Sequence, residues 1–261
     1  LFSVCLDKHV NNGKANDPAL LVESAYSDHS QSYTYKELSQ ISARMGGVLQ
    51  KLGADQQTKV LFLLPNSLEL TSGVLGTFKI GSEALVLPPN LEQIDLVKYL
   101  NHFKPDIIVM ASHIYGFDLI KPYVQWVKDA VEQSNHRPEH YIIKERKGAK
   151  RQLRDWHDYD LDKLLKHAHH AETQSVSSEQ IGIAIYGEGN QSSGMVQFET
   201  SHMGLCCSTY YPRVIPKDTK AVWHPEHFGM SYGIAYGILG PLMSGQTIII
   251  SEGQDMSDII P

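Results

Sequence analysis

The stretch Ile181-Gly-Ile-Ala-Ile-Tyr-Gly-Glu-Gly-Asn-Gln-Ser-Ser-Gly194 decides the architecture of this 261-residue chain. Its first six residues are an Ile-rich apolar run, typical of a buried β-strand, and the others are small or polar residues of a loop. Such a loop can present backbone N–H groups to a phosphate, because small side chains let an anion come close. Between Gly187 and Gln197, however, the only charge is Glu188, whereas a phosphate site normally adds a cation. The composition fits two alternatives, a nucleotide site that has lost its charge and a surface loop of no chemical importance.

Composition limits the classes of partner. The chain is long enough for one large domain or two ordinary ones. Its 23 basic and 29 acidic residues give a net charge of −6, which provides no electrostatic case for binding nucleic acid or an acidic membrane surface. The three cysteines, Cys5, Cys206 and Cys207, have no C-x-x-C spacing and predict neither a disulfide framework nor a zinc site. An intracellular reducing compartment, the mitochondrial matrix or the cytoplasm, fits this cysteine usage.

The first half of the chain alternates helical and strand patterns. Thr34 and Glu37 have the spacing of a capping box, and Gly53 ends the helix that they begin. Further helices are predicted from Asn66 or Ser67 to Gly81 and from Asn90 over a face with Leu91, Ile94, Val97 and Leu100. Continuous apolar runs predict strands over residues 60–64, 84–87 and 106–110. This alternation predicts an α/β fold with doubly wound, mostly parallel sheet layers and helices on both faces.

The middle of the chain is less regular. We expect helical material over residues 117–133, a short strand over 141–143, and a linker over 171–179 leading into the strand at Ile181. A basic run over 144–154 directly precedes an acidic run over 155–162, so the two are expected to neutralise each other. His167, His169 and His170 suggest a metal, but no Cys or nearby carboxylate completes a ligand set. Only His167 and His170 are predicted to share a helical face, and we expect no metal.

The longest uncharged run covers residues 228–250 and has the length of a membrane span. Gly240-Pro241 and Ser244-Gly245 are expected to cut it into a helix and a strand, both too short to cross a bilayer. Three glycines recur every four residues, Gly229, Gly233 and Gly237. They predict a helix face bare enough to pack directly against a sheet or another helix.

Together these segments resemble the adenylate-forming acyl-coenzyme A synthetases, and within them the acetyl and propionyl branch. Val4-Cys-Leu-Asp-Lys-His-Val10 is similar to the "NCLDRH" stretch of that branch. The segments Tyr33-Thr-Tyr-Lys-Glu-Leu38 and Leu64-Pro-Asn-Ser-Leu-Glu69 resemble "TYxEL" and "MPNSPE". Gly240-Pro-Leu242, Gly245, Thr247 and Glu252-Gly253 follow the order of "GPLxxGAT" and "EG". No one of these motifs is very specific, but their shared order along nearly the whole chain is.

At the opening stretch this chain departs from the family. The phosphate loop of the family reads Y-T-S-G-T-T-G-x-P-K-G, and an ungapped comparison places Met195 at its lysine and Gly194 at its proline. The resemblance implies a degenerate ATP phosphate loop at Tyr186, Gly189, Asn190, Gln191, Ser192, Ser193 and Gly194. Asn190 and Gln191 stand where the family has two threonines, and Ser192 where it has the next glycine. A lysine bond to phosphate contributes roughly 1.5–3 kcal/mol, so we expect weak binding of triphosphate.

The resemblance also implies a division of the chain. Residues 1–261 correspond to the N-terminal part of the family's large domain, with 1–170 as the first α/β part and 180–261 as the start of the part that carries the phosphate loop. The small C-terminal domain, in which the family keeps its adenylation lysine, is absent from this sequence.

Three functions stay open on these residues. The first is a degenerate, non-catalytic module with no cofactor, acting as a structural or interaction subunit of a larger assembly, for instance a mitochondrial one. The second is the N-terminal part of an active acid–thiol ligase that uses ATP, Mg²⁺ and coenzyme A on a small carboxylic acid through an acyl-adenylate. The third is a non-catalytic nucleotide or acyl-coenzyme A binder. The first requires protein partners, and none requires nucleic acid or a membrane span.

Overall fold

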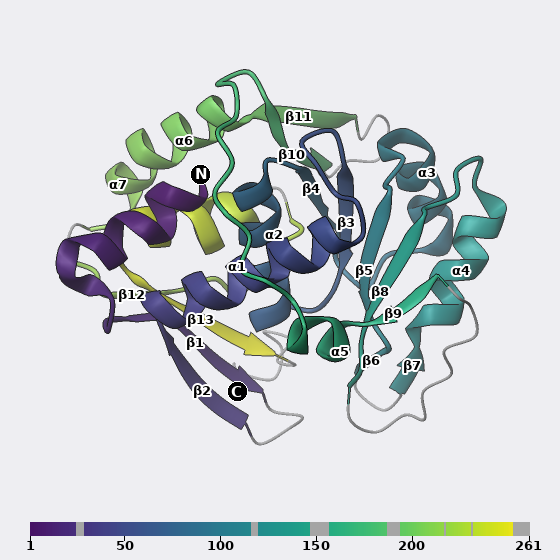
Figure 1. Ribbon diagram of the computed structural model, residues 1–261, viewed down its shortest axis with the longest axis horizontal. Coiled ribbons are helices and arrows are strands. Elements are labelled where there is room, and N and C mark those ends of the chain that lie inside the picture. The colour runs from purple at the N-terminus through teal and green to yellow at the C-terminus, as the bar shows by residue number, and fades with distance from the viewer. Residues whose placement is uncertain are drawn as a thin grey trace.

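The computed structural model describes residues 1–24, 29–115, 120–146, 157–186, 194–216, 218–230 and 232–252. In these residues a seven-stranded sheet and a four-stranded sheet are packed with helices between and around them (Figure 1). A small two-stranded hairpin, β6 (His113–Tyr115) with β7 (Ile120–Pro122), extends from the larger sheet. The predicted α/β class is confirmed.

The seven-stranded sheet has the order β11-β10-β4-β3-β5-β8-β9. Its strands are β3 (Lys59–Leu63), β4 (Glu83–Val86), β5 (Ile107–Ala111), β8 (His140–Lys144), β9 (Asp158–Asp160), β10 (Ile181–Tyr186) and β11 (Met195–Glu199). Every neighbouring pair is parallel except β10 with β11. The predicted strands over 60–64, 84–87, 106–110, 141–143 and at Ile181 are therefore confirmed within a residue or two.

Alternation along β3 explains its continuous apolar run. Val60 and Phe62 belong to the core cluster that contains residues of α1 (Tyr35–Lys51) and α2 (Leu68–Ile80). Leu61 and Leu63 belong to the cluster on the opposite face, with residues of α3 (Gln93–Phe103) and α4 (Tyr123–Gln133). Helices thus cover both faces, as a parallel sheet requires.

The caps of the first two helices agree with the sequence. The Thr34 hydroxyl accepts from the Glu37 N–H, and the Glu37 carboxylate accepts from the Thr34 N–H, which completes the capping box of α1. Ser67 caps α2, and Gly81 ends it at φ +81°, a left-handed conformation that glycine adopts without strain.

The third and fourth helices differ from their predictions. The N-cap of α3 is Glu92, which makes no side-chain cap bond, so Asn90 is not the cap. Ile94 is 63% exposed, and the buried face is instead formed by Leu96, Leu100 and Phe103. α4 starts at Tyr123 rather than near residue 117, because Pro122 and β7 precede it.

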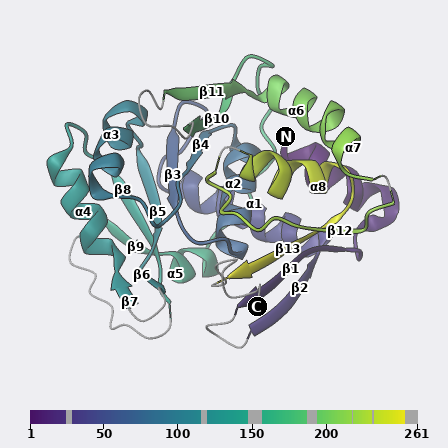
Figure 2. The ribbon, with the colours of Figure 1, turned by 180° about the vertical axis from the view of Figure 1, so that it is seen from behind.

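The opening of the chain, for which no element was predicted from the sequence, contains regular structure. Two π-helical turns, η1 (Ser3–Asp7) and η2 (Val10–Lys14), precede strands β1 (Pro18–Ser24) and β2 (His29–Thr34). These strands join β12 (Ala221–Trp223) and β13 (Thr247–Glu252) in a sheet of order β12-β13-β1-β2. β13 (yellow) and β1 (purple) lie side by side and pair in parallel (Figure 1, Figure 2).

The run over 228–250 forms a helical segment and then β13. Gly240-Pro241 does not break the helix, because the π-helical turn η3 (Ala235–Leu239) runs directly into α8 (Gly240–Met243). A wider π turn is one way to accommodate a proline, which lacks the N–H and crowds the preceding turn. The break comes at Gly245, with φ +73°.

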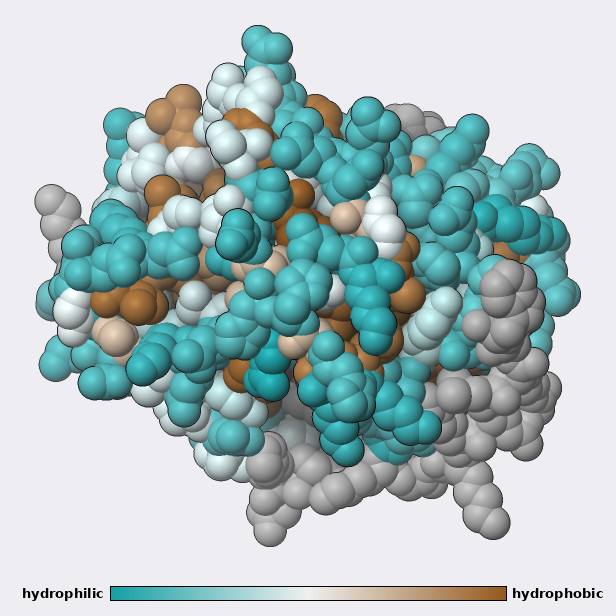
Figure 3. Space-filling model, in the orientation of Figure 1, coloured by the Kyte–Doolittle hydropathy of each residue, from teal (hydrophilic) through white to brown (hydrophobic). Residues whose placement is uncertain are grey.

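Shorter elements complete the fold. They are α5 (Leu161–Lys166), α6 (Thr200–Thr209) and α7 (Tyr211–Val214). The predicted linker over 171–179 has no regular structure and runs along α1 and α2, where the Ala171 N–H donates to the Ala43 carbonyl. Among the described residues no helix is long and apolar enough to cross a membrane, and the face in Figure 3 is mostly hydrophilic with smaller hydrophobic areas.

Candidate functional site

The candidate loop leaves the larger sheet at the carboxyl end of β10, the side where open parallel sheets bind ligands. Gly189, Asn190, Gln191, Ser192 and Ser193 lie outside the described residues. Of the predicted site, the structure describes its two flanks, Tyr186 and Gly194, and the following Met195. Tyr186 pairs with Met195 across β10 and β11, so the two ends of the loop are held together.

Tyr186 is buried at 6% exposure and packs on Tyr99, with ring centroids 4.0 Å apart. Its hydroxyl has no hydrogen-bond partner among the described residues. The pKa of Tyr186 is raised above its ordinary value, mainly by burial and to a smaller extent by the nearby Tyr99. The hydroxyl is therefore a neutral donor. A buried hydroxyl without a partner costs about 1–3 kcal/mol, and a ligand oxygen at the carboxyl end of β10 would remove that cost.

Met195, which the sequence comparison predicts to stand at the family's lysine position, is half-buried. Its side chain packs against the apolar cluster that also contains Tyr186. The described flanks therefore supply a neutral hydroxyl and a thioether, and neither is a cation that holds a triphosphate.

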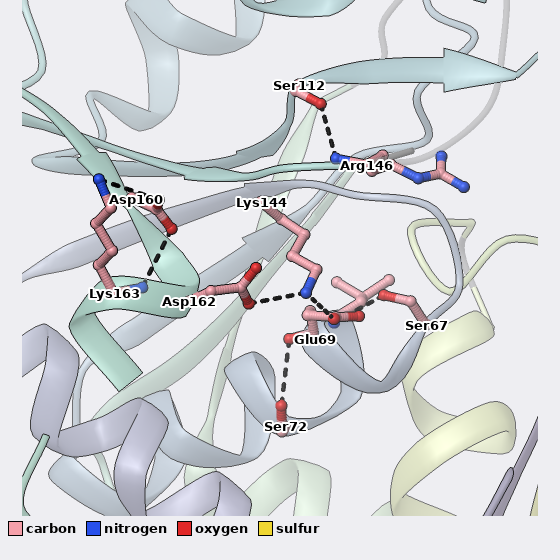
Figure 4. Close-up of polar contacts among 10 residues, drawn as sticks. Ser67, Glu69, Ser72, Ser112, Lys144, Arg146, Asp160, Asp162 and Lys163 are labelled. Atoms are coloured by element: carbon pink, nitrogen blue, oxygen red, sulfur yellow. Dashed lines mark hydrogen bonds and ion pairs between the residues drawn. The ribbon is translucent and has the colours of Figure 1, made fainter. Parts of the chain in front are cut away.

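Lys144, the cation at the carboxyl end of β8, is paired with two carboxylates. Lys144 Nζ lies 3.0 Å from Glu69 Oε1 at the start of α2 and 2.8 Å from Asp162 Oδ1 on α5 (Figure 4). Burial opposes the charge, but Glu69 and Asp162 outweigh it and raise the pKa of Lys144. β8 is four strands from β10 in the sheet, roughly 19 Å, so Lys144 lies too far away to serve as a cation at the end of β10.

The Lys144–Asp162 pair also tests the expected neutralisation of the two charged runs. It is an ion pair between the first basic and the last acidic position of those runs. Neighbouring contacts hold the same edge: Lys163 N donates to Asp160 Oδ1, and the Ser112 hydroxyl accepts from Arg146 N (Figure 4). Residues 147–156 lie outside the described part of the chain.

A turn over residues 226–230 closes over the same edge of the sheet, nearer to β10. Asn66, which follows β3, accepts from the Phe228 N–H at 2.9 Å and donates to the Glu226 carbonyl at 2.9 Å. A Cβ on Gly229 would lie 2.9 Å from the backbone of Leu87 and Pro88, just after β4. Only glycine fits there, so the turn is fixed against the ends of β3 and β4.

Asn66 and His227 together hold the turn over 226–230 against the ends of the strands, and we call this pair of residues the clamp. His227 makes its contacts through both ring nitrogens. Nε2 lies 2.8 Å from the Leu64 carbonyl, and Nδ1 accepts from the Gly229 N–H at 3.0 Å. Because a carbonyl only accepts and an N–H only donates, the imidazole is neutral, with its proton on Nε2. Burial lowers the pKa of His227 to about 4, with the Leu64 bond opposing it.

Sequence reasoning treated Asn66 only as a helix cap and did not predict a role for His227. The signal for Asn66 was its place directly after a buried strand, where ligand-side residues of parallel sheets lie. His227 gave no comparable local signal, because its partner Leu64 lies 163 residues away.

The three histidines considered for a metal are apart from this edge. His169 Nε2 lies 3.0 Å from Gln50 Oε1. α5 ends at Lys166, so the predicted helical face shared by His167 and His170 does not exist. No group of three potential ligands that could hold a metal occurs within the described ranges.

Comparisons with known proteins define the class. The family model described as AMP-binding enzyme matches residues 6–260. The chain therefore belongs to the AMP-binding enzyme family, and the resemblance inferred from its motifs is confirmed.

Particular relatives are acyl-coenzyme A synthetases. The chain is 23% identical to mouse "Acyl-CoA synthetase short-chain family member 3, mitochondrial" over 97% of its own length and 38% of the relative's. It is 24% identical to acetyl-coenzyme A synthetase of Pseudoalteromonas translucida over 95% of its own length and 39% of the relative's. A crystal structure of Brucella canis acyl-CoA synthetase matches with a TM-score of 0.81 at 19% identity, covering 99% of this chain and 45% of that one. The chain thus spans less than half of these relatives and corresponds to a part of an AMP-binding acyl-CoA synthetase.

Proposed function

We propose that this chain is a degenerate acyl-CoA synthetase-like module that does not catalyse adenylation and serves as a structural or interaction subunit of a larger assembly, with a mitochondrial setting as one candidate. The observation that carries the proposal is the packing of Met195 into the apolar cluster beside Tyr186, at the position where we expect the family's lysine. A phosphate loop without its cation and most of its hydroxyls loses the interactions that hold ATP. The division into 1–170 and 180–261 belongs to the same proposal.

The first test is acid-dependent exchange of pyrophosphate into ATP. The purified chain is assayed with acetate, propionate and butyrate against a blank without acid, with the Pseudoalteromonas translucida acetyl-CoA synthetase as the active reference. We expect no exchange above the blank. Exchange with any of the three acids would contradict the non-catalytic reading.

A second test distinguishes two causes of absent exchange activity, the degenerate loop and the short length of the chain. Residues 181–199 replace the corresponding segment in the full-length Pseudoalteromonas translucida enzyme, and a matched chimera carries the same segment with Met195→Lys, Ser192→Gly, Gln191→Thr and Asn190→Thr. We expect the first chimera to lose about a hundredfold or more in exchange rate, from ~1.5–3 kcal/mol for the lysine and ~0.5–1.5 for each hydroxyl. The second chimera should recover most of it. Equal activity of the two would show that the loop is not what limits the chemistry.

The alternative function is the N-terminal part of an active ATP-dependent short-chain acyl-CoA ligase, using ATP, Mg²⁺ and coenzyme A on a small carboxylic acid. It is favoured by Tyr186, whose buried hydroxyl at the carboxyl end of β10 has no partner among the described residues and would suit a ligand oxygen. An exchange rate of the first chimera equal to that of the second would select this alternative.

A further inference from the structure

Two histidines lie opposite each other where β8 and β9 begin, at one side of the larger sheet (Figure 1). His140 is the first residue of β8, and His157 directly precedes β9. The two strands are parallel, and their register pairs Tyr141 with Asp158. His140 and His157 are therefore neighbours across the strands and point to the same face of the sheet. Their ring centroids lie 6.4 Å apart, with 47° between the ring planes.

Contacts on the opposite face hold these two strands together. The Tyr141 N–H donates to the His157 carbonyl at 3.0 Å. Lys128 of α4 places its Nζ 2.8 Å from Asp158 Oδ2 and 5.4 Å from the centre of the Tyr141 ring. Because side chains alternate along a strand, these contacts lie on the face away from the two histidines. The backbone of the pair is thus fixed before any ligand binds, which lowers the cost of bringing both rings to one ion.

The His140 ring has a nitrogen available for a ligand. Its Nδ1 is buried and has no hydrogen-bond partner among the described residues. Tyr159 supports the ring from the side, with the two centroids 5.5 Å apart and the planes nearly perpendicular. A buried nitrogen without a partner is unfavourable, and a metal ion bonded to it would remove that cost. His140 and His157 are both half-buried, so an ion can reach the pair from solvent.

The separation of the rings suits a shared metal ion. With metal–nitrogen bonds of ~2.0–2.1 Å, the centroids of two imidazoles on one ion lie roughly 5 Å apart in a tetrahedral arrangement and roughly 6.5 Å apart on opposite sides of the ion. The observed 6.4 Å falls within this range. Imidazole nitrogen is a good ligand for Zn²⁺ and Cu²⁺, whereas Mg²⁺ and Ca²⁺ prefer oxygen. The described ranges contain no group of three His, Cys, Asp or Glu that could hold a metal, so water would complete the coordination.

We propose that His140 and His157 form a two-histidine binding site for a divalent metal ion of the Zn²⁺ and Cu²⁺ kind. An ion bound there links β9, an edge strand, to β8 and stabilises the folded chain, because the unfolded chain does not hold the two rings together. The site is separate from the three histidines that the sequence suggested, at positions 167, 169 and 170. The proposal does not depend on the state of the phosphate loop.

Calorimetric titration of Zn²⁺ into the chelator-treated chain tests the proposal, with Mg²⁺ as the control ion. Two variants, His140→Gln and His157→Gln, each remove one ring of the pair. The matched control is the double variant His167→Gln and His170→Gln, which removes two histidines outside the pair. Circular dichroism establishes that each variant is folded.

We expect one Zn²⁺ ion to bind per chain and no heat from Mg²⁺. Each variant of the pair should raise the dissociation constant for Zn²⁺ by about tenfold or more, because a single imidazole is a weak ligand. The control double variant should bind as the original chain does. Absence of Zn²⁺ binding, unchanged affinity in either variant of the pair, or a loss of affinity in the control variant overturns the proposal.

A measurement on the original chain covers the case in which a variant of the pair does not fold. The electron paramagnetic resonance spectrum of the chain with one equivalent of Cu²⁺ shows how many imidazole nitrogens bind the ion. We expect two. A spectrum with one imidazole nitrogen or none contradicts the two-histidine site.

Discussion

Two regions at the same edge of the larger sheet differ in how completely their polar groups are hydrogen-bonded. In the turn over 226–230, Asn66 and His227 both hydrogen-bond through two side-chain atoms, and glycine stands where the backbone of another segment leaves no room. At the loop flanks, Tyr186 has a buried hydroxyl without a described partner, and Met195 packs as an apolar residue. The polar groups of the turn are paired, whereas the described flanks of the loop hold a buried hydroxyl without a described partner and no cation. This contrast is what a retained fold with a weakened site predicts, because fold and site can change separately.

The largest expected effect concerns Gly233, which packs against the turn of the first region. A Cβ on Gly233 would lie 2.5 Å from backbone atoms of Phe228, which cannot move aside as a flexible side chain can. Gly233→Leu should lower the free energy of unfolding by about 3 kcal/mol or more, at or beyond the top of the usual range for overpacking. Urea denaturation measures this loss.

The matched control is Gly204→Leu on α6. There a Cβ would meet nothing closer than a Leu1 side-chain carbon at 3.6 Å, so the change should be neutral or stabilise by up to about 1 kcal/mol through helix propensity. Equal tolerance of the two substitutions would mean that the turn and helix are not closely packed.

The next effect is a dependence on pH. The pKa of His227 falls to about 4 in the folded chain from an ordinary value of 6.5, so between these values the unfolded chain binds the extra proton. The stability that His227 contributes is complete above pH 6.5 and is lost as pH falls towards 4, by up to about 3 kcal/mol. Urea unfolding at pH 7 and pH 4.5 should show a steeper loss in the original chain than in His227→Gln.

His102→Gln, at an exposed position on α3, is the control for this comparison. It should keep the pH dependence of the original chain. A His227→Gln variant with an unchanged slope would show that His227 is not held neutral by the clamp.

The smallest effect tests the Asn66 half of the clamp. Asn66→Ala leaves the Phe228 N–H and the Glu226 carbonyl without their partners, and should cost about 1–2 kcal/mol. Asn66→Asp keeps the acceptor for Phe228 and should cost less. If both variants unfold at the same urea concentration as the original chain, the turn is held by packing alone.

Local signals predicted much of the fold. The caps at Thr34 and Ser67 and the apolar runs of β3, β4, β5 and β10 are read from adjacent residues, and they are confirmed. β1 and β2 were missed because their pairing is not local: β1 pairs with β13 about 230 residues away, and β2 reads H-S-Q-S-Y-T without an apolar pattern. The predicted helix break at Gly240-Pro241 was wrong, because a π turn can accommodate a proline. The spacing of residues in the sequence does not reveal such a turn.

The site was less predictable. Its position followed from a strand that runs into a small-residue loop, and β10 confirms that strand. The clamp could not be predicted from the sequence, because Asn66 and His227 contact residues about 160 positions away. Only the folded sheet brings those segments together. That Lys144 is committed to Glu69 and Asp162 was also hidden, because those carboxylates lie on α2 and α5.

The central claim, that the loop has lost its hold on phosphate while its surroundings persist, is tested most directly by calorimetric titration of ATP. The original chain is compared with the variant Asn190→Thr, Gln191→Thr, Ser192→Gly and Met195→Lys. We expect no measurable heat from the original chain. The variant should bind, since ~0.5–1.5 kcal/mol from each hydroxyl and ~1.5–3 from the lysine amount to about a hundredfold or more in dissociation constant. Undetectable heats from both would mean that the pocket itself is lost, and tight binding of ATP by the original chain would contradict the claim.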